Sequence, residues 1–117
     1  MNEFRELGYR LFKEWSKAIQ KFNQRPGAED GPRIKQESSN RMSPTDGKPD
    51  ILWMEAKLHR SGKVLAEATI EINYVLRTFD VIRPNHAVER FPSQKVDITG
   101  LVDWVITRLT GSQGHSR

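Results

Sequence analysis

Hydrophobic residues at helical spacing mark both ends of the chain. From Phe4 to Phe22 they recur every three or four positions with charged residues between them, which is the pattern of one buried helical face. A second stripe of the same spacing follows Asp97, a residue suited to cap a helix, and Gly111 is suited to end it. The sequence therefore predicts one helix near each end of the chain.

Alternating hydrophobic and polar positions in the middle of the chain predict a β-hairpin. Residues 51–59 and 63–74 alternate with period two and are rich in β-branched side chains. A three-residue loop ending at Gly62, with this glycine in the left-handed conformation, pairs His59 with Lys63. The even-numbered residues of both strands then share one apolar face, which we expect to lie against the helices.

Further strands are predicted between the hairpin and the second helix. A bend near residues 76–78 leads to a third strand around 79–83, and residues 86–91 are a candidate edge strand. A competing helical spacing over 68–79 ranks second because the alternation of period two is unbroken before it. The predicted fold class is α+β, an antiparallel sheet of three or four strands with the N-terminal and C-terminal helices packed on one face, in the order α-β-β-β-(β)-α.

Residues 24–50 separate the first helix from the hairpin and are poor in hydrophobic side chains. They contain four of the six prolines, and their apolar residues are only Ala28, Ile34 and Met42. We therefore interpret this segment as a long mobile loop or insertion within a single domain of 117 residues. A short edge strand over residues 33–37 is the alternative.

Composition excludes several functional classes. Nineteen Lys and Arg against fifteen Asp and Glu give a net charge of +4, which permits nucleic-acid binding without indicating it. The absence of cysteine excludes disulfides, thiol nucleophiles and zinc–thiolate sites. Charged residues interrupt the apolar positions near the N-terminus, so we predict no secretory signal and no membrane span, and expect a cytoplasmic protein. Glycine-rich nucleotide motifs are missing, and we expect no cofactor.

The predicted register places Glu55 directly opposite Glu67 on the outer face of the hairpin. Opposed carboxylates raise the pKa of one member or gather oxygen ligands for a cation, unless solvent or a nearby cation such as Lys57 relieves the repulsion. Glu55-Ala56-Lys57 also resembles the E-x-K of restriction-type nucleases, in which a strand supplies a metal-binding carboxylate and a lysine that orients water. A metal-dependent nuclease or hydrolase that uses Glu55, Lys57 and Glu67 is therefore the alternative function.

The three histidines are too far apart in the sequence to predict a metal site formed by neighbouring residues. His59 and His86 each flank a predicted turn, and His115 lies in the C-terminal tail. Their separation in sequence gives none of the short spacings of a local histidine ligand pair. We therefore interpret them as exposed loop residues.

The outer face of the hairpin carries the residues that we expect to bind a partner. Trp53 lies on this face without an assigned core role, and basic or imidazole side chains crowd the hairpin tip, namely Lys57, His59, Arg60 and Lys63. Carboxylates on the same face disfavour phosphates, so a protein partner ranks ahead of a nucleic acid. A neighbouring edge strand could pair with a second copy, and we expect a homodimer. The predicted function is non-catalytic binding of a macromolecule through the outer sheet face and the long loop.

Overall fold

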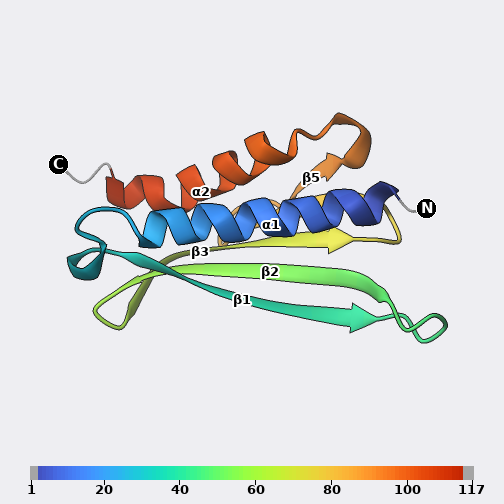
Figure 1. The fold of residues 1–117 in the computed structure, drawn as a ribbon, viewed down its shortest axis with the longest axis horizontal. Helices are drawn as coiled ribbons and strands as arrows, with labels where there is room; N and C mark the ends of the chain where they lie inside the picture. Colours follow the sequence, from blue (N-terminus) through green and yellow to red (C-terminus); the bar gives the residue numbers. More distant parts are fainter. Residues whose placement is uncertain (1–2, 115–117) are drawn as a thin grey trace.

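The computed structural model describes residues 3–114, except for the side chains of residues 95 and 112–114. Within residues 3–114, two α-helices flank five strands along the chain (Figure 1). The elements are α1 (Glu3–Asn23), a short 3-10 helix (Ala28–Asp30), β1 (Arg33–Met42), β2 (Pro49–Arg60), β3 (Lys63–Asn73), β4 (Thr78–Ile82), β5 (Glu89–Pro92), a second 3-10 helix (Ser93–Lys95) and α2 (Ile98–Gly114).

Both helices cover the same face of one antiparallel sheet. The strands follow sequence order, β1-β2-β3-β4-β5, so that every strand pairs with its neighbour in the chain. The helices lie side by side and run in the same direction, as Figure 1 shows. Between the layers lies a single hydrophobic cluster, in which Trp15 of α1, Phe79 of β4 and Val105 of α2 are fully buried. The predicted α+β fold is confirmed, whereas the sheet has five strands in place of three or four.

The additional strand, β1, lies within the segment that we interpreted as a loop. Its residues pair with β2 along its whole length, from Arg33 opposite His59 to Met42 opposite Pro49. Only Ile34 is buried, and the next three positions on the helix side (Gln36, Ser38 and Asn40) are polar, so this strand lacks the hydrophobic alternation that would reveal it in the sequence. Interpreting 24–50 as one long loop was therefore wrong over β1, and the alternative edge strand over 33–37 was correct in place but too short.

The hairpin between β2 and β3 closes through two residues instead of three. Ser61 and Gly62 both have positive φ angles, 53° and 79°, as a tight type I′ turn requires, and Arg60 pairs with Lys63. The shorter turn moves the pairing by one residue from the prediction, and a bulge between Leu58 and His59 moves it by one more, so the strands pair two residues away from the predicted register.

This shift of two residues preserves the predicted faces and changes the partners across them. The inner positions from Leu52 to Leu58 still face the helices. Leu58 lies opposite Ala66, however, and Val64 is 53% exposed instead of joining the core. On the outer face Glu67 lies opposite Lys57, so the predicted opposition of Glu55 and Glu67 is wrong.

A turn without glycine or proline separates β3 from β4. The side chain of Asn73 accepts hydrogen bonds from the backbone N–H groups of Val75 (3.0 Å) and Leu76 (2.9 Å), and Arg77 adopts a φ of 58°. An asparagine side chain that bonds the following backbone groups is a common way to close a turn. The predicted bend is thus confirmed, and β5 begins three residues later than we expected.

Candidate partner-binding surface

The face of the sheet away from the helices carries one row of polar and aromatic side chains across all five strands. Register aligns one residue from each strand, and we call these five residues the outer row: Ser39, Trp53, Glu71, Asp80 and Arg90. The indole N–H of Trp53 donates a hydrogen bond of 2.8 Å to a carboxylate oxygen of Glu71. Adjacent positions of the row therefore form a connected network.

At the other end of the row, Asp80 and Arg90 form a two-pronged ion pair. The Nε and one Nη of Arg90 each donate to a different carboxylate oxygen of Asp80, both at 3.0 Å. The Asp80 side chain is 3% exposed, whereas that of Arg90 is 55% exposed. The hydrogen bond to Asp80 raises the pKa of the Arg90 guanidinium, and Coulomb attraction adds to this effect. Arg90 is thus a fixed cation on the outer surface.

Two carboxylates are neighbours in this row. Glu71 and Asp80 occupy directly opposed positions of β3 and β4. The Trp53 N–H engages Glu71 and the Arg90 guanidinium engages Asp80, so donors flank the pair on both sides. Within residues 3–114, no group of three or more histidines and acids is placed to hold a metal ion.

A shallow hollow of about 320 Å³ lies beside Trp53. Trp53 lines it together with Thr69 and Ile82 from the next two strands. Glu37, Glu55 and the two serines of β1 also line it. The hollow therefore combines an aromatic surface with hydrogen-bond acceptors, which is the chemistry of a recognition pocket at a protein interface.

The predicted partner-binding residues divide between two places. Trp53 is half-buried in the outer row, whereas Arg60 and Lys63 are exposed at the hairpin tip, about 20 Å further along the strand at the usual rise per residue. Lys57 lies between them on the outer face and forms an ion pair of 3.6 Å with Glu55. His59 is half-buried next to the bulge. The structure therefore does not bring Trp53 and the basic tip together as one site.

Glu55 and Glu67, which we predicted to lie opposite each other on the hairpin, have other cross-strand neighbours in the structure. Glu55 lies opposite Thr69 on one side and Glu37 on the other, while Glu67 faces Lys57. The ion pair with Lys57 relieves the repulsion between Glu55 and Glu37. The geometry that motivated a two-carboxylate cation site at Glu55 and Glu67 is therefore absent from this part of the sheet.

Sequence reasoning missed the partners of Trp53 in the outer row. Glu71, Asp80 and Arg90 lie on three different strands, and the register of two of the strand pairs was not predicted. One signal was present in the sequence, because Asp80 is a single charge between the hydrophobic residues Phe79 and Val81. A buried charge of this kind needs a partner of opposite sign, which the structure supplies through Arg90.

The histidines occupy separate surfaces. His86 lies in the connection between β4 and β5, where its Nδ1 is 2.8 Å from the carbonyl oxygen of Pro84. It lines a cavity next to the first residues of β3. His115 lies outside the described residues.

Comparison with known proteins gives no relative. No family model, curated protein or solved structure matches this chain. Neither described helix combines the length and apolar character needed to cross a membrane. The function is therefore argued from the surface of the molecule.

Proposed function

We propose that this chain is a small non-catalytic binding protein that docks a protein partner on the outer face of its sheet. One observation carries the proposal: Trp53 lies half-buried on the face that neither helix covers, with its indole N–H held by Glu71. A rigid aromatic side chain beside a hollow is typical of an interface anchor, and tryptophan and arginine dominate the binding energy of many interfaces. Arg90 supplies a fixed guanidinium in the same row.

The charges of this face favour a protein over a nucleic acid. Acidic and basic side chains are paired on this face: Lys35 with Glu37, Lys57 with Glu55, and Arg90 with Asp80. A phosphate backbone gains little there, because nucleic-acid affinity depends mainly on cationic side chains and these already have carboxylate partners. A protein surface can match a mixture of both signs.

The segment that we interpreted as a binding loop contributes to this face in another form. Its strand β1 supplies Glu37 and Ser39 to the hollow beside Trp53. The proposed surface thus consists of strand residues with fixed spacing. Cytoplasmic location and a homodimer stay predictions of the sequence.

A photo-crosslinking amino acid at Ser39 tests the proposal directly. Ser39 is exposed and lines the hollow, so the probe reaches a partner bound there without replacing a core residue. Tyr9, which is 64% exposed on α1, is the matched control position on the helix layer. Irradiation in cells that make the protein should give a discrete protein adduct from position 39 and none from position 9.

The purified partner then allows a quantitative test of Trp53. Trp53→Ala should weaken binding about thirtyfold or more if the indole is an interface hot spot, whereas Tyr9→Ala should leave the affinity unchanged. Circular dichroism checks that both variants fold. Adducts with nucleic acid, hydrolysis of nucleic acid with Mn²⁺ that is lost in Glu55→Gln, or an adduct between two copies of this chain would each replace the proposal with another function.

A further inference from the structure

The excess positive charge of the chain is concentrated in one stretch of its first helix. Residues 9–25 contain five basic residues and one acidic residue. Of the nineteen basic and fifteen acidic residues in the chain, fourteen of each lie outside this stretch. The net charge of +4 therefore belongs to residues 9–25, and the charges of the rest of the chain balance.

The five bases follow one face of α1 and continue just past its end. They recur every three or four positions, which places them in line on a helix, and we call them the basic stripe: Arg10, Lys13, Lys17, Lys21 and Arg25. The first four are exposed, and Arg25 is half-buried. Figure 1 shows α1 running straight along the molecule, so neighbouring bases follow one another at intervals of about 5–6 Å. Attraction to the helix dipole explains bases in the last turn only, which leaves Arg10 and Lys13 unexplained.

A hollow of about 460 Å³ lies beside the last turns of α1, and no carboxylate of the described residues lines it. Its lining consists of Lys17, Gln20, Lys21, Gln24, Arg25 and Pro26. The guanidinium of Arg25 is held in place, because it donates to the carbonyl oxygens of Phe22 (2.7 Å) and Pro32 (2.6 Å). Its central carbon also lies 3.8 Å from the centroid of the Phe22 ring. These partners are neutral, so Arg25 is a fixed cation at the hollow.

Two carboxylates lie beside the basic stripe and leave most of its charge unmatched. Glu14 and Asp103 line the groove between α1 and α2. Glu14 forms an ion pair of 3.8 Å with Lys17. Within residues 3–114, no carboxylate forms an ion pair with the other four bases of the stripe. Even with Asp103 counted against one of these four, three positive charges have no acidic partner.

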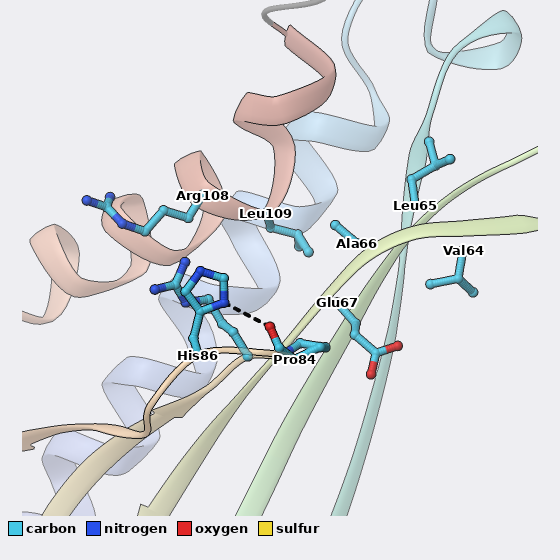
Figure 2. A pocket seen from close by; sticks show the side chains of 9 residues that line it. Val64, Leu65, Ala66, Glu67, Pro84, His86, Arg108 and Leu109 are labelled. Carbon is cyan, nitrogen blue, oxygen red and sulfur yellow. Dashed lines mark hydrogen bonds between the residues drawn. The ribbon is translucent and has the colours of Figure 1, made fainter.

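The basic side chains around the cavity between β3 and α2 differ, because acids balance them. Figure 2 shows Arg108 of α2 and Glu67 of β3 on the walls of this cavity. Arg83, which also lines it, pairs with Glu89 at 3.0 Å. The excess of positive charge is therefore a property of the basic stripe and not of every group of bases on this surface.

We propose that the basic stripe binds the phosphate backbone of a single-stranded nucleic acid without reading its sequence. A single strand is flexible and carries one negative charge per nucleotide, so it can follow a straight row of bases. One phosphate enters the hollow beside the fixed guanidinium of Arg25. This site goes beyond the proposed function, because it lies on the helix layer and not on the sheet face around Trp53.

The apolar residues of α1 argue against an anionic membrane as the partner. Leu11, Trp15 and Ile19 are buried in the core, and Tyr9 is the one exposed large hydrophobic residue among residues 3–23. A helix that lies on a bilayer buries a whole apolar face in the headgroup region. The exposed face of α1 offers charges in place of such a surface, and a phosphate backbone requires charges.

Fluorescence anisotropy with a fluorescein-labelled DNA strand of about 20 nucleotides tests the proposal. The full chain should bind the strand at low salt. The logarithm of the association constant should fall with the logarithm of the salt concentration with a slope of about −3.5, because each of five contacts contributes about 0.7. Trp53→Ala should leave this binding unchanged, so the result is independent of the proposed protein-binding face.

Two triple variants of equal net charge show whether the stripe is the site. Lys13→Gln, Lys17→Gln and Lys21→Gln together remove three bases of the stripe. Lys35→Gln, Lys48→Gln and Lys63→Gln together remove three exposed lysines from the sheet and its turns. The helix variant should bind at least about tenfold more weakly, with a slope smaller by about 2, whereas the strand variant should keep its affinity within about twofold. Circular dichroism checks that both fold.

Three results would overturn the proposal. Equal weakening by the two triple variants would show that total charge, and not the stripe, governs binding. Failure of the natural chain to bind the DNA strand at low salt would exclude the proposed ligand. Vesicles of phosphatidylserine and phosphatidylcholine that bind the chain more tightly than the DNA strand does would assign the stripe to a membrane surface.

Discussion

At the scale of single residues, Tyr74 links α1 to the end of the sheet. Its ring makes an edge-to-face contact with Phe4 (centroids 5.5 Å apart) and lies 4.5 Å from the guanidinium carbon of Arg5. Its backbone N–H donates to the carbonyl oxygen of Asp50 at 2.8 Å. Burial raises the pKa of the Tyr74 hydroxyl above its ordinary value of 10.0, and attraction to the positive charge of Arg5 opposes part of this rise.

This raised pKa predicts a loss of stability at alkaline pH. Between the unfolded and folded pKa values the unfolded chain binds fewer protons at Tyr74, so the free energy of unfolding falls as pH rises above about 10. Below that pH the contribution is fully present. Urea unfolding at a series of pH values should show a steeper alkaline decline for the natural chain than for Tyr74→Phe. Parallel curves for the two proteins would contradict this assignment, since other groups titrate in both.

At the scale of elements, the side chain of Asn23 makes the hydrogen bonds to the free edge of β1 that a neighbouring strand would otherwise make. Its side-chain amide donates to the carbonyl oxygen of Ile34 and accepts from the N–H of the same residue, both at 2.8 Å. A backbone pair at the edge of the sheet is thereby satisfied by the last residue of α1. This contact and the hydrogen bond from Gln36 to Ser16 (2.9 Å) attach a polar strand to the helix layer.

Removing this side chain tests how β1 is held. Asn23→Ala should lower the free energy of unfolding by about 1–3 kcal/mol, because two hydrogen bonds to a partly buried backbone are lost together. Gln24→Ala is the control, since Gln24 is exposed one position further along the chain. Urea denaturation monitored by circular dichroism measures both values. Equal stability of the two variants would show that β1 does not depend on this attachment.

At the scale of the whole molecule, Gly8 sets how closely the helix layer approaches the sheet. A Cβ atom at this buried position would lie 2.9 Å from the hydroxyl oxygen of Tyr74 and 3.4 Å from a methyl carbon of Ile72. The first distance is shorter than a carbon–oxygen contact allows. The α1 helix therefore depends on a glycine in its interior, although glycine is a poor helix former.

We predict that replacing Gly8 with alanine destabilises the protein, because the cost of the clash exceeds the gain in helix propensity. Alanine gains about 1 kcal/mol from propensity, whereas overpacking between the layers costs about 1–3 kcal/mol, so Gly8→Ala should be destabilising overall. Adding Tyr74→Phe removes the clashing hydroxyl. A double-mutant cycle should therefore give a favourable interaction energy between the two substitutions. Strict additivity would show that the layers adjust without contact between these residues.

The proposed binding surface depends on this arrangement of layers. Both helices lie on one side of the sheet, so the outer face, which carries Trp53 and the outer row, is not covered by a helix. Strand β4 is also shorter than β3 and pairs only with residues 69–73 of it. The sequence placed Trp53 on the outer face correctly, because a strand alternates its faces with a period of two. It could not place Asp80 and Arg90 beside it, since their strands were not assigned a register.

Local patterns in the sequence determined both helices, the faces of the hairpin and the α+β class, because burial repeats with the period of each element. Only the tertiary structure decided the pairing between strands. The two-residue turn and the bulge after Leu58 together shifted one register by two residues while preserving the buried face, so the pattern fits both registers. Strand β1 formed from polar residues through backbone hydrogen bonds to β2, which leave no mark in hydrophobicity. Edges, registers and the cavity beside them arise from contacts between segments distant in the chain, and local periodicity carries no information about them.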